Sequence, residues 1–499
     1  MLKNIKYTIK NAVIYGMGNL ASKVVGFILL PLYTQKLTVS EYGMLSVIEV
    51  SSLILISFFG MALYQALFRW YLDKQFIEKQ KSIFFTSLIY ILGIAVLMVV
   101  GLLFLSKPIS LLLFQTTTYH YLIKLMIVSA GLELVLQIPN TLIRIQEKPK
   151  LFLVSNLIRL AFSFFFTLFF IIYLNKKIEG IYEALIIAQI VNLLILTKFI
   201  KKNITFKFDY KVLKEMIYYS LPLALSSIAA ATIGYTDRLA LNFVGAGLND
   251  VGLYSLGQKM ANTVNIFIVF SVNLAIWPLI FKKMNDPDNK RFYSKIMTYY
   301  AFGLMFFILL ISLYGKEVTK VITLNPAYWD SYQIIPYISM AAFFGMLKDV
   351  SLIGLQITKK TKVIAIVIIG SAVLNVILNV ILITFFQTKG SAIATLLTQI
   401  FYFILIYRFA QKQYYIPYEI TKVIKILVIS FAMMVVSEII NPYSLWIRLF
   451  TKTTLLCSFP ILLYLWNFYE KAEIEALKNF WLKWKNPQNW KNNMKQIKF

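Results

Sequence analysis

The sequence predicts an all-α membrane protein of about fourteen transmembrane helices, built as two six-helix lobes followed by two further helices. Apolar residues make up 59% of the 499 residues and charged residues only 14%. Mean hydropathy is +0.72, and apolar runs long enough to cross a bilayer recur along the whole chain. A soluble core could not bury that much apolar surface. Landmarks of the first half also return in the second half, in the same order.

The hydropathy profile indicates a membrane span wherever a long apolar run begins. The predicted spans start near Ala12, Tyr42, Phe84, Tyr119, Leu151, Ile178, Glu215, Val251, Ile296, Trp329, Val363, Gly390, Val423 and Leu445. We therefore expect a first lobe at 1–200, a cytoplasmic linker at 201–214, a second lobe at 215–411, two extra helices at 412–467 and a basic tail at 468–499. The segment from Ala12 carries polar residues and lacks a cleavage site, so we expect an uncleaved first helix.

The repeat rests on four matches in register. Tyr33–Leu37 returns as Tyr235–Leu239, Glu41–Ser46 as Asp250–Ser255, Leu142–Gln146 as Leu352–Gln356, and Gly180 with Gln189 as Gly390 with Gln399. Each pair is separated by roughly 200 residues, which is the spacing of a duplicated half. Because six spans is an even number, both copies enter the membrane from the same side. The sequence therefore predicts a parallel repeat about an axis along the membrane normal, an arrangement found in transporters.

The distribution of basic residues predicts the orientation. If Met1 is cytoplasmic, the inward segments carry roughly four times as many Lys and Arg residues as the outward segments. Both termini are therefore expected in the cytoplasm. The net charge of +28 is spread over many short loops, which argues against nucleic-acid binding and favours contact with anionic lipids.

Charged residues inside the predicted spans are the main functional signal. Lys23, Arg159, Lys259 and Lys348 each fall within an apolar run, where a lipid-facing charge costs about 2.5–3.5 kcal/mol. We expect them to face protein or water; helix–helix contacts and snorkelling are the structural alternative. Asp349 follows Lys348 directly, but neighbouring residues on a helix point about 100° apart, so the sequence does not predict that these two pair.

One stretch resembles a known family. Tyr235–Leu241, Asn249–Ser255 and Lys259 are similar to the Asp-Arg and acid-Val-Gly-x-Tyr segment of Wzx-like polysaccharide flippases, members of the multidrug/oligosaccharidyl-lipid/polysaccharide (MOP) exporter superfamily. Pro31, Glu41–Gly43 and Arg69 resemble the first half of the same family. The resemblance implies alternating access that moves undecaprenyl-pyrophosphate-linked repeat units of O-antigen, lipopolysaccharide or capsule to the outer leaflet. It also implies that the chain lies in the inner membrane of a bacterium, with a polysaccharide polymerase and chain-length proteins as candidate partners.

Physical chemistry agrees with that activity, because a diphosphate and its sugars need a wet, cationic path across the bilayer. The predicted substrate-binding residues are Lys23, Arg69, Arg159, Lys259 and Lys348. The candidates for coupling or gating are Glu49, Glu133, Asp237 and Arg238. Transport could be coupled to the membrane potential, to H⁺ or to Na⁺. No catalytic residue, metal ligand set or cofactor is expected.

Rival functions stay open at this point. A cation- or proton-coupled multidrug antiporter of the same superfamily would use an acidic cavity, for which Glu49 and Glu133 are the candidates. The branch that flips lipid II favours an arginine-rich lumen, whereas this chain places Lys23, Lys259 and Lys348 there. A membrane glycosyltransferase or polymerase would need large outward loops, and those predicted here are short.

The tail shows a helical pattern of its own. Apolar residues recur at helical spacing between lysines, namely Ile474, Leu477, Phe480, Trp481 and Trp484. This pattern predicts an amphipathic helix lying on the inner leaflet.

Overall fold

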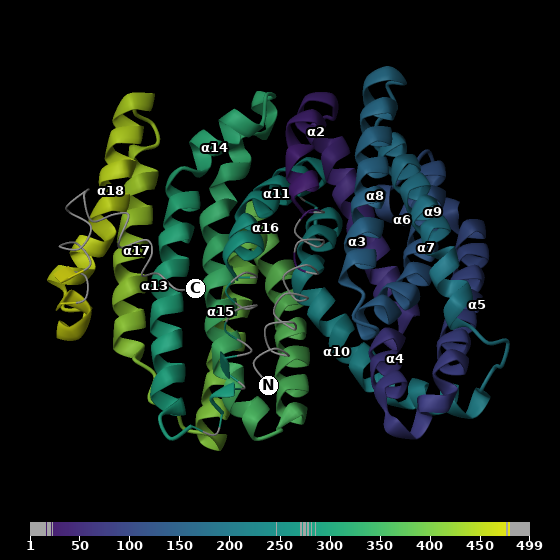
Figure 1. Ribbon diagram of the computed structural model, residues 1–499. Coiled ribbons are helices and arrows are strands. Elements are labelled where there is room, and N and C mark those ends of the chain that lie inside the picture. Colours follow the sequence, from purple (N-terminus) through teal and green to yellow (C-terminus); the bar gives the residue numbers. More distant parts are fainter. Residues whose placement is uncertain are drawn as a thin grey trace, which may run out of the picture. The chain divides into compact units, whose positions relative to one another are not determined.

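The computed structural model describes residues 23–245, 247–269 and 286–475, together with single residues beside these ranges. Over these residues the chain is helical, with no β-strand (Figure 1). Eleven helices are long and apolar enough to cross a membrane. The longest, α16 (Thr361–Gln413), joins two helices across a kink at Gln387, so it supplies two of the predicted spans. The predicted fold class is confirmed, while part of the first span and most of the tail helix lie outside the described residues.

The chain divides into two compact units. The first contains Met1–Asp286 and Gly315–Tyr415, and the second contains Pro287–Tyr314 and Ile416–Phe499. The ninth predicted span therefore groups with the last two spans. The boundaries of the two predicted lobes stay predictions.

The first half of the first unit is a succession of membrane-length helices with short helices between them. Its elements are α2 (Leu30–Lys36), α3 (Val39–Gly60), α4 (Leu63–Leu72), α5 (Gln80–Phe104), α6 (Ser106–Phe114), α7 (His120–Ile145), α8 (Pro149–Leu168), a π-helical turn (Phe169–Tyr173) and α9 (Ile178–Asn203). A capping box starts α3, because Thr38 Oγ1 accepts a hydrogen bond from the Glu41 backbone N–H and the Glu41 carboxylate accepts one from the Thr38 N–H. At Met61 and Ala62 the backbone turns left-handed, with φ of 46° and 52°, which separates α3 from α4.

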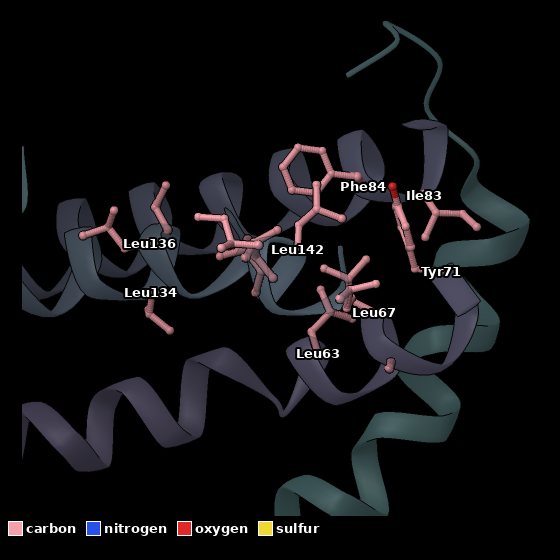
Figure 2. Packing of buried hydrophobic residues seen from close by; sticks show 14 of the residues in the cluster. Leu63, Leu67, Tyr71, Ile83, Phe84, Leu134, Leu136 and Leu142 are labelled. Atoms are coloured by element: carbon pink, nitrogen blue, oxygen red, sulfur yellow. The ribbon is translucent and has the colours of Figure 1, made fainter. Parts of the chain in front are cut away.

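The packed core of this half lies where α4, α5 and α7 meet. Figure 2 shows Leu63, Leu67 and Tyr71 of α4 facing Phe84 of α5 and Leu142 of α7. These side chains are buried, and each is at most 7% exposed. Lipid tails are as apolar as these side chains, so close van der Waals packing, rather than removal from water, holds this cluster together.

The second half of the first unit contains a long helix, a broken helix and a tight hairpin. Its elements are α10 (Tyr210–Phe243), α11 (Gly247–Ala261), a π-helical turn (Asn265–Val269), α14 (Gly315–Ile322), η4 (Pro326–Ile334), α15 (Ile335–Ile357) and α16. The kink in α16 folds its two parts so closely that a Cβ on Gly390 would lie 2.0 Å from the Leu382 carbonyl oxygen. The repeat-related Gly180 sits at the equivalent turn, where a Cβ would lie 2.9 Å from Phe170 Cβ. The repeated glycines therefore mark two close backbone approaches.

The second unit contains α13 (Asn289–Leu313), α17 (Ile420–Ile440) and α18 (Leu445–Leu465). Phe302 stacks on Phe459 with ring centroids 5.8 Å apart. Near the start of α17, Lys295 Nζ lies 2.8 Å from Glu419 Oε1, and Thr298 Oγ1 donates to Glu419 Oε2 at 2.7 Å. Burial opposes the ionisation of Glu419, but hydrogen bonds from Lys295, Thr298 and Lys422 outweigh it and lower its pKa to about 2.

Large apolar side chains on many helices point away from the protein. Phe104, Leu97, Phe385 and Trp446 are each more than 70% exposed. Exposure of this kind on membrane-length helices is the pattern of a lipid-facing surface.

Candidate functional site

A cavity of about 600 Å³ lies in the first unit, walled mainly by the second half of the chain. Its size is within the range of small-molecule sites. Small residues such as Ala230, Ala341 and Gly345 leave the space open. Its polar lining residues are Ser57, Tyr235, Asp237, Gln258, Asn262, Asn265, Lys348, Asp349, Thr395 and Gln399. Seven of these ten polar residues are neutral, and four of the seven carry an amide side chain.

Lys348 is the lysine on this wall, and it is not a free cation. Its Nζ lies 2.9 Å from Asp349 Oδ1 and 4.7 Å from the ring centroid of Tyr402. The pairing was not expected from residues that are adjacent on one helix. It forms because the flexible lysine stem carries the ammonium away from the direction of its Cα–Cβ bond. This pair is therefore close to neutral, and it leaves the wall without excess positive charge.

Asp237 is fully buried on the cavity side of α10. Its Oδ2 accepts hydrogen bonds from the Tyr254 hydroxyl at 2.5 Å and the Thr395 hydroxyl at 2.8 Å, and its Oδ1 accepts one from Asn379 Nδ2 at 3.1 Å. Ser391 donates in turn to Asn379 Oδ1 at 2.7 Å. Neutral donors thus surround the carboxylate and link α10 to α11 and to both parts of α16. A buried carboxylate held in this way is a suitable place for a proton or a cation to act.

A second polar group lies close to the start of α3. The Lys259 ammonium is 5.8 Å from the ring centroid of Tyr42, and Glu49 and Arg238 lie within electrostatic range of it. Arg238 Nη2 donates to Gln258 Oε1 at 2.5 Å. The structure therefore brings together Lys259, Glu49 and Arg238, which the sequence placed in different spans.

The first half has a separate ion pair. Arg159 Nη1 of α8 lies 3.0 Å from Glu133 Oε2 of α7. Gln189 Nε2 of α9 donates to the same oxygen at 3.1 Å and to the Ser129 carbonyl at 3.2 Å. The side chains of Arg159 and Glu133 are 20% and 32% exposed. Arg159, predicted to bind substrate, therefore forms a salt bridge with Glu133, a predicted coupling residue.

Lys23 and Arg69 are exposed and lie outside the set of residues that line the cavity. The Arg69 guanidinium is 4.6 Å from the ring centroid of Tyr219 and 5.7 Å from that of Trp70. This aromatic platform holds a cation at the end of α4. Arg159 and Lys259 also lie outside the cavity lining.

Sequence reasoning placed Asp237 and Lys348 among the functional residues but gave no role to Gln258 or Asn265, which line the same cavity. Tyr254 belongs to the segment Asn249–Ser255 that carries the family resemblance. Gln399 was marked by the repeat, and its Oε1 is buried without a hydrogen-bond partner. In the part of the chain that the structure describes, no three His, Cys, Asp or Glu side chains gather as metal ligands.

The chain shares its fold with solved membrane transporters. It superposes on the lipid II flippase MurJ in an inward closed conformation with a TM-score of 0.73, covering 91% of this chain and 99% of that one at 15% identity. It also superposes on an inward-facing MATE family multidrug resistance transporter of the MOP superfamily with a TM-score of 0.62, covering 80% and 94% at 14% identity. At these identities the likeness establishes the fold.

Curated relatives are membrane proteins. The chain is 24% identical over 260 residues to an uncharacterized membrane protein of Methanocaldococcus jannaschii, covering 48% of this chain and 49% of that one. It is 26% identical over 292 residues to an uncharacterized membrane protein of Haemophilus influenzae, covering 56% and 67%. The first of these matches thus spans about half of the relative's length.

The family assignment rests on sequence. Residues 8–284, more than half of the chain, match the family described as polysaccharide biosynthesis protein. This match and the two superpositions agree with the resemblance seen in Tyr235–Leu241 and Asn249–Ser255. The chain is a multi-pass membrane protein with the fold of MOP-superfamily transporters, and it belongs to the polysaccharide biosynthesis protein family.

Proposed function

We propose that this protein is a flippase that moves an undecaprenyl-pyrophosphate-linked oligosaccharide, an O-antigen or capsule repeat unit, from the inner to the outer leaflet. The observation that carries the proposal is the amide-lined cavity within a MOP-type fold. Amide side chains both donate and accept hydrogen bonds, which matches sugar hydroxyl groups. Polysaccharide polymerase and chain-length proteins would act on the product.

The cavity fits the sugar part of the substrate better than its diphosphate. Asp349 neutralises Lys348 at 2.9 Å, so the wall offers little net positive charge. Gln258, Asn262 and Gln399 offer hydrogen-bonding groups instead. The diphosphate then belongs with cations that have no carboxylate at this distance among the described residues. The candidates are the exposed Lys23, within the first predicted span, and the exposed Arg69, toward the cytoplasmic side.

Two sources of energy could drive transport, namely an ion that binds at Asp237 and the membrane potential. Asp237, buried on the cavity side, is placed to link a proton or Na⁺ to changes in the helices that contact it. The outward movement of about two negative charges would also gain about 4.6 kcal/mol per 100 mV from an inside-negative potential.

Ligand binding by the purified protein tests the proposal. Native mass spectrometry or thermal-shift titration would compare an undecaprenyl-pyrophosphate oligosaccharide, lipid II and a cationic drug. We expect the lipid-linked oligosaccharide to bind most tightly, and Gln399→Ala to weaken it by about two- to fivefold. Preferential binding of lipid II would move the protein to the lipid II branch. Binding of the drug alone would favour the antiporter and overturn the flippase.

A further inference from the structure

The repeated segments Glu41–Ser46 and Asp250–Ser255 contact each other in the structure. They lie at the starts of α3 and α11, which cross with their backbones in direct contact. A Cβ on Gly43 would lie 1.9 Å from the Leu248 carbonyl oxygen, and a Cβ on Gly252 would lie 2.1 Å from the Val39 carbonyl oxygen. No side chain fits at either position, so glycine is what permits this crossing.

The contact is reciprocal. Val39 precedes Gly43 by four residues, as Leu248 precedes Gly252, and the two pairs are separated by the spacing of the repeat. Gly43 meets Leu248 and Gly252 meets Val39. Val39 and Leu248 occupy the same position in the two copies of the repeat, as do the two glycines. Reciprocity of this kind is the property of a two-fold interface, here formed between the two halves of one chain.

Further hydrogen bonds join the halves at the same end. The Tyr328 hydroxyl of η4 donates to the Leu37 carbonyl at 3.0 Å and to the Thr38 carbonyl at 2.9 Å. Asn242 Nδ2, at the end of α10, donates to the Leu113 carbonyl of α6 at 2.7 Å. The charge distribution predicts that all of these segments face outward.

We infer that the Gly43–Gly252 crossing is the outer gate of the transport cycle, closed in this structure. The inference rests on the proposed function, because a carrier that releases its substrate outward must separate the halves at this end. At the crossing the Val39 side chain packs against Gly252, and the Tyr328 ring meets the Tyr42 ring edge-to-face at 5.9 Å between centroids. These contacts and the hydrogen bonds from Tyr328 and Asn242 then hold the gate shut reversibly.

The gate is tested by the reactivity of a thiol placed at the crossing. Val39 is 9% exposed and its Cγ1 would lie 2.9 Å from a Cβ on Gly252. Val39→Cys is made with Cys457→Ser, because Cys457 is the single cysteine and is exposed. Labelling by a bulky maleimide is measured on purified protein in nanodiscs, so both faces meet the reagent and membrane orientation does not affect the result.

We expect slow labelling of this background and an about tenfold faster rate after either Gly43→Ala or Gly252→Ala, because each methyl group disfavours the closed state. Gly93→Ala is the matched control, since nothing lies within 4 Å of a Cβ there, and it should leave the rate unchanged. Tyr328→Phe keeps the ring and removes two hydrogen bonds, so it should raise the rate about two- to threefold.

The inference fails if folded Gly43→Ala and Gly252→Ala proteins label at the rate of the Gly93→Ala control. Should both alanine variants fail to fold, an unchanged rate in Tyr328→Phe overturns it equally. No substrate is present in this assay. A faster rate therefore supports the gate even if the ligand-binding experiment rejects a lipid-linked glycan, which separates the failure of one proposal from that of the other.

Discussion

The two copies of the repeat place the same motif in different surroundings. In the first copy α2 ends at Lys36, and Gln35 and Lys36 are exposed. In the second copy α10 continues to Phe243, Asp237 is fully buried and Arg238 is bound to Gln258. The two copies of the motif therefore differ both in how far their helix continues and in the surroundings of their charged residues.

The polar centres of the halves differ in the same way. The first half holds an Arg159–Glu133 pair whose side chains are partly exposed. The second half holds a buried carboxylate among neutral donors, next to a cavity lined by amides. The second half thus supplies most of the cavity's lining, whereas the first half contributes Ser57 to it. Four measurements test this difference between the halves.

The largest effect is expected at the motif itself. Asp237→Ala leaves the Tyr254, Thr395 and Asn379 donors without their acceptor, so we expect a loss of about 3–5 kcal/mol in unfolding free energy and loss of export. Gln35→Ala, at the equivalent position of the first copy, should change stability by less than about 0.5 kcal/mol. Denaturant unfolding in detergent measures both. Equal effects at the two positions would remove the asymmetry.

The second measurement separates charge from pairing at Lys348. Lys348→Met leaves Asp349 without its ion-pair partner, and we expect roughly tenfold lower export, as measured by surface polysaccharide in a complementation assay. The double variant Lys348→Met/Asp349→Asn should regain thermal stability but not export. Full recovery of export in the double variant would show that this pair serves structure alone.

The third measurement compares the repeat-related glutamines. Gln189 bridges Glu133 and the Ser129 carbonyl, so Gln189→Ala should cost about 1 kcal/mol of stability with little change in affinity. Gln399→Ala should leave stability nearly unchanged and weaken ligand binding by about two- to fivefold. Thermal shift measures stability and ligand titration measures affinity on the same preparations. A stability loss in Gln399→Ala together with an affinity loss in Gln189→Ala would contradict the prediction.

The smallest effect is expected outside both halves, in the second unit. The pKa of Glu419 is lowered to about 2 in the folded protein, so its stabilising contribution is full above its unfolded pKa of about 4.3. That contribution is lost as the pH falls from there toward 2. Glu419→Gln should therefore reduce stability at pH 7 by roughly 0.5–1 kcal/mol, after allowance for solvent screening. The difference from the parent protein should vanish near pH 2; a constant difference across this range would contradict the assignment.

The sequence alone determined the membrane class, the helical fold and the duplication. Apolar runs must become helices in a bilayer because every backbone hydrogen bond has to be satisfied within the segment. It also selected Asp237 and Lys348, because charge within an apolar run is costly and visible in one dimension. The sequence also marked Gly180 and Gly390 as repeated positions. The structure explains why both are glycine, because a Cβ at either position would lie too close to a neighbouring residue.

Tertiary structure decided what those charges contact. Lys348 pairs with its neighbour Asp349, Arg159 pairs with Glu133, and the amides Gln258 and Gln399 line a cavity with Asp237. Helical periodicity gives the direction of a side chain around its own helix, but it does not specify which helix lies opposite. The crossing of Gly43 and Gly252 was decided in the same way, because the contact of two repeat copies depends on how the halves pack, and packing is absent from a linear pattern.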